Sequence, residues 1–387
     1  MQLADRMNRL GTESAFEVLA RAKALEAQGR EIVHLEIGEP DFDTPPHIIE
    51  AAIKALRDGY THYTPSAGLP VVRQTIAEHV SRSRGVDVRP EQVVVTPGAK
   101  PIMFFTILAL LQPGDEAIYP DPGFPIYRSM INFVGAKPVP LPLREDKDFR
   151  FDPAEFRSLV NDRTKLIIIN TPQNPTGGVL TKSDLEAIAD VARERNIPVL
   201  SDEVYEQILY EGEHVSLMSL PDMLPHTILL DGFSKTYAMT GWRLGYGVMP
   251  LPLAEQMTRL MTNSNSCTSA STQMAGVAAL TGPRGEVNQM IAAFRERRDV
   301  IVSGLNQIPG FRCANPAGAF YVFPNIEGTG RGSKEMENLL LDKAGVAALS
   351  GSGFGVHGDG YVRFSYANSI PNIKKALQRI REMVDTL

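Results

Sequence analysis

Short apolar runs rich in β-branched residues alternate with helix-length amphipathic segments between about residues 91 and 247. This alternation is the pattern of βαβ units, in which helices cover a largely parallel sheet. The predicted strands span residues 93–96, 116–119, 165–170, 198–202, 228–231 and 244–248. The sequence therefore predicts an α/β fold with a mostly parallel central sheet flanked by helices.

The pattern changes after about residue 290. A charged helix is followed by predicted strands at residues 320–323 and 361–365 and by a final helix from about residue 371, which indicates a smaller α+β domain. A helix at residues 14–28 and a strand at 32–37 precede the large domain, and we expect them to pack on the C-terminal part. The expected division is a large domain, 41–290, and a small domain built from both termini, 1–40 and 291–387.

The charge balance limits the partners that the chain binds. Its 39 basic and 45 acidic residues give a net charge of −6, which argues against nucleic acid or an anionic membrane as the main partner. The longest apolar stretch, residues 102–111, is too short to span a bilayer, and the N-terminus lacks the apolar core of a signal peptide. We therefore expect no membrane contact and a cytoplasmic location.

Metal and disulfide chemistry are not expected. Cys267 and Cys313 are the only cysteines, and we interpret both as buried or inert thiols. No two of the seven histidines stand four residues apart, and none lies beside a cysteine pair. The sequence therefore predicts no metal site.

Polar residues gather at or just after the carboxyl ends of four predicted strands. In open α/β sheets, ligands bind where the carboxyl ends of the strands meet. An aspartate that ends a nearly all-apolar strand, as Asp202 does, requires a cationic partner or a function. We expect one cleft lined by Gly98, Asn174, Asp202, Ser234 and Lys235.

Three motifs occur in a fixed order: Asn-Thr-Pro-Gln-Asn-Pro-Thr-Gly at 170–177, Ser-Asp-Glu-Val-Tyr at 201–205, and a Ser-Lys pair followed by Gly-Trp-Arg at 234–243. Over essentially the whole chain, this set resembles the class I, aspartate aminotransferase-like family of fold-type I pyridoxal phosphate enzymes. One motif alone would be weak, but the ordered set is specific. The resemblance implies pyridoxal 5'-phosphate as cofactor and amino transfer between an amino acid and a 2-oxo acid.

The resemblance also implies roles for residues around the cofactor ring. Lys235 would carry the cofactor as a Schiff base and then move the proton at the substrate α-carbon. Burial and the positive Arg243 would favour its neutral amine. Asp202 would pair with the pyridine nitrogen, while Tyr205 and Asn174 would hydrogen-bond the phenolic oxygen.

The cofactor phosphate needs donors in a partly enclosed site. The resemblance implies backbone amides at a helix N-terminus, a hydroxyl and a guanidinium. These would come from Gly98, Ala99, Lys100, Ser234 and Arg243. The ring of Phe124 would stack on the cofactor, although the family often has a tryptophan or tyrosine there.

Substrate residues are implied in the same way. Arg363 would clamp the α-carboxylate, with the Gly38 loop and Asn174 beside it. Tyr63 resembles the tyrosine that reaches the phosphate of the neighbouring subunit, which implies a homodimer with shared active sites. Lys100 matches a lysine that binds the distal carboxylate in an aspartate-specific subgroup. That subgroup has a nearby hydroxyl where this chain has Phe16, so dicarboxylate specificity stays open.

Two other functions compete with an aminotransferase. A pyridoxal phosphate-dependent C–S β-lyase would use the same residues to expel a leaving group, and the sequence barely separates it from a transaminase. A non-catalytic aminotransferase-like sensor would need a DNA-binding extension, and the acidic net charge offers no substitute for one. For the transaminase, we expect glutamate and 2-oxoglutarate as one substrate pair, with aspartate-type or broad specificity for the other.

Overall fold

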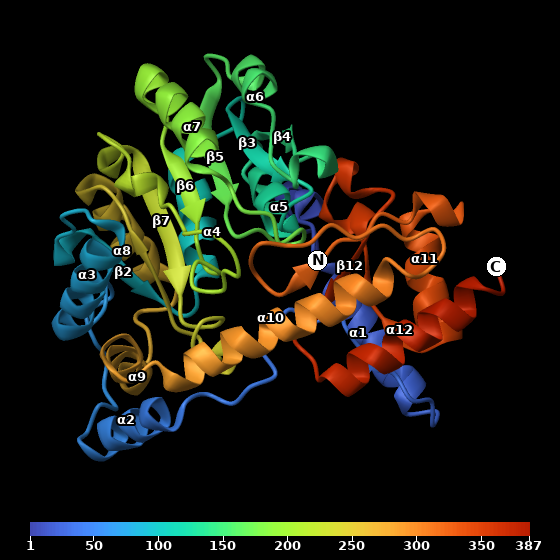
Figure 1. Cartoon of the computed structure of the whole chain (residues 1–387). Coiled ribbons are helices and arrows are strands. Elements are labelled where there is room, and N and C mark those ends of the chain that lie inside the picture. Colours follow the sequence, from blue (N-terminus) through green and yellow to red (C-terminus); the bar gives the residue numbers. More distant parts are fainter.

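A seven-stranded sheet forms the centre of the larger part of the molecule in the computed structural model, which describes residues 1–387 (Figure 1). Its order is β2-β8-β7-β6-β5-β3-β4. The strands are β2 (Val93–Thr96), β3 (Glu116–Asp121), β4 (Lys137–Pro142), β5 (Thr164–Asn170), β6 (Val199–Asp202), β7 (Thr227–Gly232) and β8 (Gly245–Val248). Only β8 runs antiparallel to its neighbours, so the predicted α/β fold with a mostly parallel sheet is confirmed.

All six strands predicted for this sheet are present, and their ends differ by at most two residues from the expected ones. The sequence analysis missed the seventh strand, β4. Its Pro138, Pro140 and Pro142 cannot donate backbone hydrogen bonds, and prolines usually argue against a strand. β4 tolerates them because it is an edge strand that pairs only with β3.

Helices cover both faces of the sheet. They are α2 (Pro46–Arg57), α3 (Pro70–Arg84), α4 (Lys100–Leu110), α5 (Pro125–Phe133), α6 (Pro153–Leu159), α7 (Lys182–Arg195), α8 (Leu251–Ser264) and α9 (Ala270–Thr281). Side chains of a strand alternate between faces. On β5, Ile168 therefore belongs to the cluster that includes α4, while Ile167 and Ile169 belong to the cluster that includes α7.

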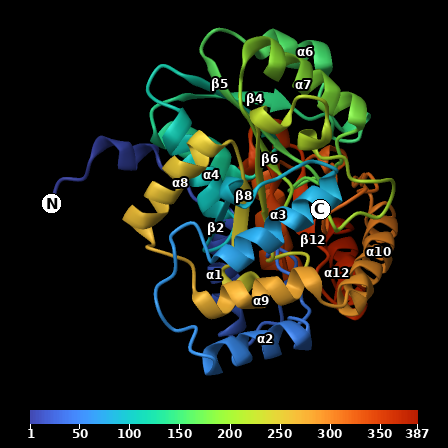
Figure 2. The ribbon, with the colours of Figure 1, turned by 90° about the vertical axis from the view of Figure 1, so that its left-hand side faces the viewer.

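Segments far apart in the sequence close one end of the large sheet. α2 and α3 precede β2, whereas α9 follows β8, yet α9 packs against both helices (Figure 2). Their shared core includes Ile48, Ile76 and Ala275. This end of the sheet is therefore stabilised by packing of α9 against α2 and α3, which lie about 200 residues earlier in the chain.

The C-terminal part contains a small antiparallel sheet of order β11-β12-β9. Its elements are α10 (Gly285–Leu305), β9 (Tyr321–Val322), α11 (Ser333–Leu339), β10 (Val346–Ala347), β11 (Leu349–Ser350), β12 (Val362–Ser365) and α12 (Ile370–Val384). α10 extends from α9 across to α12 (Figure 1). The strands predicted at 320–323 and 361–365 correspond to β9 and β12.

The N-terminal segment joins this C-terminal part. α1 (Ser14–Glu26) leads to β1 (Val33–His34), which pairs in parallel with β10. β1 is shorter than the strand predicted at 32–37, because β10 offers only two residues as a partner. A domain division at residues 40 and 290 stays a prediction.

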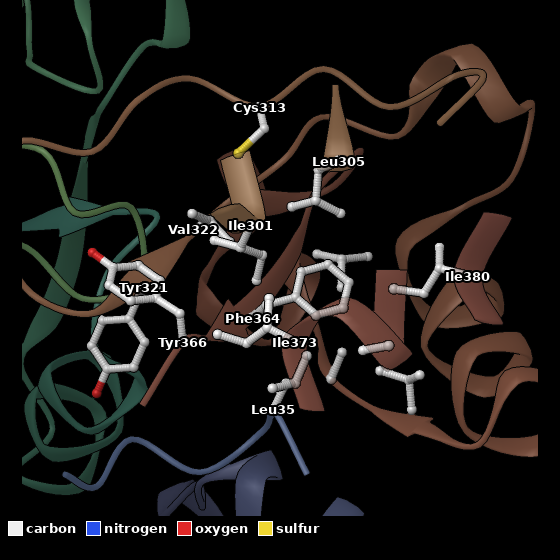
Figure 3. Close-up of a cluster of buried hydrophobic side chains, with 14 of the residues drawn as sticks. Leu35, Ile301, Leu305, Cys313, Tyr321, Val322, Phe364, Tyr366, Ile373 and Ile380 are labelled. Atoms are coloured by element: carbon white, nitrogen blue, oxygen red, sulfur yellow. The ribbon is translucent and has the colours of Figure 1, made fainter. Parts of the chain in front are cut away.

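The core of the C-terminal part fixes the position of β12. Phe364 of β12 is buried among Leu35, Ile301 of α10 and Ile373 of α12 (Figure 3). Burying a large apolar side chain contributes about 1.5–3 kcal/mol. Neighbouring side chains of a strand point to opposite faces. Because Phe364 points into this core, the side chain of Arg363 points away from it.

No helix combines the length and the apolar character that a bilayer crossing requires. The two cysteines are free thiols; Cys313 is buried and Cys267 is half-buried. No three metal-ligating side chains of the His, Cys, Asp or Glu type converge. A cytoplasmic location stays a prediction.

Candidate active site

A cavity of about 520 Å³ opens where β5, β6 and β7 end. The last residue of each strand, or the loop that follows it, lines the cavity, as expected for an open α/β sheet. Most residues singled out in the sequence meet here: Gly38, Ala99, Lys100, Phe124, Asn174, Asp202, Tyr205, Ser234, Lys235, Arg243 and Arg363. The structure therefore brings together residues that are up to 325 positions apart, from Gly38 to Arg363.

Gly98 lies behind the cavity wall. It has a φ of +85°, a left-handed conformation that favours glycine, and a side chain there would overlap the guanidinium of Arg243. A side chain at Gly245 would likewise overlap the backbone of Gly98 and Ala99. The N-terminus of α4 is thus held close to both β8 and a cation, which is a favourable arrangement for an anion.

Tyr63 does not reach the cavity of its own chain. Its side chain is 90% exposed and borders a separate surface hollow together with Cys267 and Thr268. Among the residues singled out in the sequence, only Gly98 and Tyr63 lie outside the lining of the main cavity.

Lys235 is held in the loop after β7. Its Nζ donates a hydrogen bond of 2.6 Å to the carbonyl oxygen of Gly38. Burial lowers the pKa of Lys235 to about 8, and the positive charges of Arg363 and Arg243 act in the same direction. Near pH 8, about half of this amine is therefore neutral and able to act as a nucleophile or base.

Asp202 ends β6 and is buried. Its Oδ2 accepts a hydrogen bond of 2.5 Å from the hydroxyl of Tyr127. Burial raises the pKa of Asp202 to about 6, although the Tyr127 bond lowers it in part. At pH 7 the carboxylate is mostly ionised yet has an unusually high affinity for a proton, which suits it to share a proton with a basic ligand.

The sequence analysis missed Tyr127. Phe124 and Tyr127 stand three positions apart at the start of α5, a spacing that brings two side chains of a helix together. Their rings pack edge to face with centroids 5.6 Å apart. Helical spacing from Phe124 was therefore the available signal for this second aromatic residue.

Tyr205 contacts another tyrosine that the sequence analysis did not single out. The hydroxyls of Tyr205 and Tyr321 are 2.8 Å apart, and both rings are buried. Burial raises the pKa of both phenols, so both are neutral near pH 7. Tyr321 comes from β9, so the C-terminal part supplies one wall of the site.

Arg363 is a buried cation held between two aromatic rings. Its guanidinium carbon lies 4.5 Å from the ring centre of Tyr321 and 5.1 Å from that of Phe354. Nη1 donates to Oδ1 of Asn174 at 3.0 Å, and Nη2 donates to the carbonyl oxygen of Glu36. Nε is buried without a partner. An isolated buried charge is costly, so this arrangement favours an anionic ligand.

A second buried charge cluster lies behind Asp202. Nη2 of Arg84 is 3.2 Å from a carboxylate oxygen of Glu203 and 3.2 Å from one of Asp231. Burial opposes ionisation of Glu203, but the nearby His214 and Arg84 overcome it and lower its pKa to about 2. Because Glu203 follows β6 and Asp231 lies on β7, this cluster ties together the two strand ends that carry Asp202 and Lys235.

The sequence is similar to a known protein family and to individual characterised proteins. Residues 30–380 match the family described as aminotransferase class I and II. The chain is 41% identical to an aspartate aminotransferase of Pyrococcus horikoshii, over 99% of this chain and 97% of that protein. It is 39% identical to an aromatic-amino-acid aminotransferase of Thermococcus litoralis, over 99% and 98% of the two chains.

The fold is shared more closely than the sequence. A structure of aspartate aminotransferase from Thermus thermophilus with maleate superimposes with a TM-score of 0.95 and 38% identity. The match covers 99% of this chain and 100% of that one.

Proposed function

The chain belongs to the class I and II aminotransferase family, and on this premise we propose that its cavity binds pyridoxal 5'-phosphate at Lys235. It is an aminotransferase, which moves an amino group between an L-amino acid and a 2-oxo acid. The observation that carries the cofactor proposal is the amine of Lys235, whose pKa is lowered to about 8 and which shares one cavity with Asp202 and Arg363.

The residues around the cavity fit the chemical groups of this cofactor. An aldehyde requires an amine that is partly neutral, and Lys235 supplies it. A phosphate requires cations and amide donors, and Arg243, Ser234 and the N-terminus of α4 lie beside the cavity. The hydrogen-bond partners of Lys235, Arg243 and Arg363 are carbonyl or amide oxygens, so no carboxylate competes with an anionic ligand.

Bound pyridoxal phosphate supplies an electron sink that stabilises negative charge at the substrate α-carbon. Asp202 would hold a proton at the pyridine nitrogen, and Tyr127 would hold Asp202 in place. Asn174 and Tyr205 would hydrogen-bond the phenolic oxygen, and Phe124 would cover one face of the ring. All five side chains line the same cavity, which supports these proposed roles.

Arg363 would bind the α-carboxylate of the substrate through its free Nε and its Nη atoms. The Gly38 loop and Asn174 lie beside it. With the substrate oriented in this way, the Lys235 amine would remove the proton from the α-carbon as a general base and return it elsewhere on the substrate–cofactor unit.

We propose glutamate and 2-oxoglutarate as one substrate pair, and an aspartate-type or broad specificity for the other. The relatives described above are named for aspartate and for aromatic amino acids, and this division motivates a broad panel of donors. Lys100 and Phe16 both line the cavity, so a cation and an apolar ring are available to different side chains.

A spectroscopic experiment tests the function. An amino donor should bleach the long-wavelength absorption of the cofactor-loaded protein, and 2-oxoglutarate should restore it through the second half-reaction. Aspartate, alanine, phenylalanine and leucine should be compared as donors. Release of pyruvate and ammonia from a cysteine-type substrate without any 2-oxo acid would instead indicate the β-lyase, and binding without turnover would indicate the sensor.

We further propose a homodimer with shared active sites. Tyr63 is exposed on its own chain, and we infer that it completes the phosphate site of a second copy. Lys235→Ala and Tyr63→Ala chains should each be weakly active alone. After mixing and reassociation, activity should recover to about a quarter of wild type, because half of the dimers then contain one intact site. A lack of recovery despite mixed dimers would place Tyr63 outside the partner's site.

A further inference from the structure

An ion pair borders the active-site cavity at the end formed by α1 and α4. Nζ of Lys100, the first residue of α4, contacts the Oε1 atom of Glu13, the residue that precedes α1. The Lys100 side chain is 48% exposed, and that of Glu13 is 20% exposed. Both residues line the cavity, so the pair lies where a substrate side chain would enter.

The surroundings of this pair are apolar. Lys100 Nζ lies 5.3 Å from the ring centre of Phe124, and the cavity wall continues through Ala15 and Phe16. Phe16 is 64% exposed and lines the cavity, so its ring is accessible to a ligand there. While Lys100 and Glu13 stay in contact, their charges cancel. This end of the cavity then offers a mostly apolar contact surface to an uncharged substrate side chain.

The carboxylate of Glu13 also acts on the interior of the cavity. Burial lowers the pKa of Arg363, and the negative charge of Glu13 opposes that effect. Glu13 acts in the same opposing direction on Lys235. These two cations belong to the substrate and cofactor positions, so Glu13 would repel a second carboxylate of an incoming substrate.

We propose that Glu13 is a specificity-determining residue that occupies Lys100 as an internal carboxylate. When the substrate side chain is uncharged, the pair stays closed and the apolar wall around Phe16 and Phe124 receives that side chain. When the substrate is a dicarboxylate, its distal carboxylate must displace Glu13 from Lys100. This inference rests on the proposed aminotransferase function. It implies that the enzyme accepts both dicarboxylates and substrates with uncharged side chains, and that it favours the uncharged ones.

Replacing Glu13 by glutamine tests the proposal. Exposed ion pairs contribute little, so freeing Lys100 should raise dicarboxylate affinity by only about three- to fivefold. Glu13→Gln should therefore raise kcat/KM for glutamate and tighten succinate binding, measured by calorimetry on the cofactor-loaded protein, by this factor. The kcat/KM for phenylalanine and the Kd of hydrocinnamate should change by less than about twofold.

Glu17→Gln is the matched control, because it removes the same charge from the exposed face of α1 one turn away. It should leave both substrate classes unchanged. In a Lys100→Ala background, Glu13→Gln should improve succinate binding by less than about twofold, since no lysine remains to be released.

Several outcomes would overturn the proposal. An equal effect of Glu13→Gln with and without Lys100 would mean that Glu13 acts only as a distant negative charge. Unchanged discrimination between glutamate and phenylalanine would mean that the pair is a surface contact without a role in selection. Both results require an active protein, whereas failure of every variant and of the wild type to transfer amino groups would instead reject the proposed function.

Discussion

Replacing Lys235 by alanine is expected to reduce kcat for amino transfer by about 10⁴-fold, the upper range for loss of a positioned acid–base group. The amine is placed in the cavity by its bond to Gly38, and burial keeps its pKa near 8. No other lysine except Lys100 lines the cavity, and Lys100 is paired with Glu13. The measurements are steady-state kcat with glutamate and 2-oxoglutarate, and absorbance of the loaded protein.

Borohydride reduction supplies a second measurement for the same residue. In the wild type, it should leave a pyridoxyl group on the peptide that contains Lys235, and mass spectrometry should find none in Lys235→Ala. Lys182→Ala is a suitable control, because that lysine is exposed at the start of α7 and does not line the cavity. Unaltered colour and labelling in Lys235→Ala would refute the assignment of the amine.

Replacing Asp202 by asparagine should lower kcat by about 10²- to 10³-fold, as is typical when one preorganised electrostatic partner is lost. The amide is nearly the same size but carries no charge, so a proton on the ring nitrogen would lose its counter-ion. The cofactor should still attach to Lys235, because Ser234, Arg243 and the N-terminus of α4 are unchanged. Stopped-flow measurement of the half-reaction with glutamate would separate this effect from substrate binding.

Although the same substitution lowers kcat, it should increase the stability of the cofactor-free protein. Burial raises the pKa of Asp202 to about 6, above that of an unfolded aspartate, so ionisation of this group destabilises the fold as the pH rises through 4 to 6. Asp202→Asn should therefore raise the melting temperature at pH 8 and have less effect at pH 4. A melting temperature that falls at pH 8 would contradict the assigned cost of burying this charge. Asp190→Asn, on the exposed face of α7, controls for general charge removal.

Local sequence information was sufficient for most of the large sheet. Strands such as β2, β6 and β7 consist of consecutive buried residues, so their signal does not depend on distant partners. The motifs around Asn174, Asp202 and Lys235 each follow a strand, and the fold brings their strand ends together. This part of the site could therefore be predicted from short segments alone.

The residues that support the site could not be predicted in this way. Arg84 lies on α3, and only the packing of that helix brings it to Glu203 and Asp231. Tyr321 reaches Tyr205 because β9 packs beside the large sheet, and short-range patterns carry no information on that approach. Glu13 lies just before a predicted helix, and nothing in its neighbourhood indicates that it contacts Lys100.

The close contact of Gly98, Ala99 and Gly245 has a consequence for how such a protein can diverge. Any larger residue at position 245 would push the start of α4 away from β8, so this wall of the cavity tolerates almost no variation. The neighbouring part of the lining, at Glu13 and Phe16, is less constrained, because Glu13 lies just before α1 and Phe16 is 64% exposed. Substitutions at Glu13 or Phe16 can therefore change which amino acid is accepted, while the part of the cavity wall at the start of α4 stays nearly unchanged.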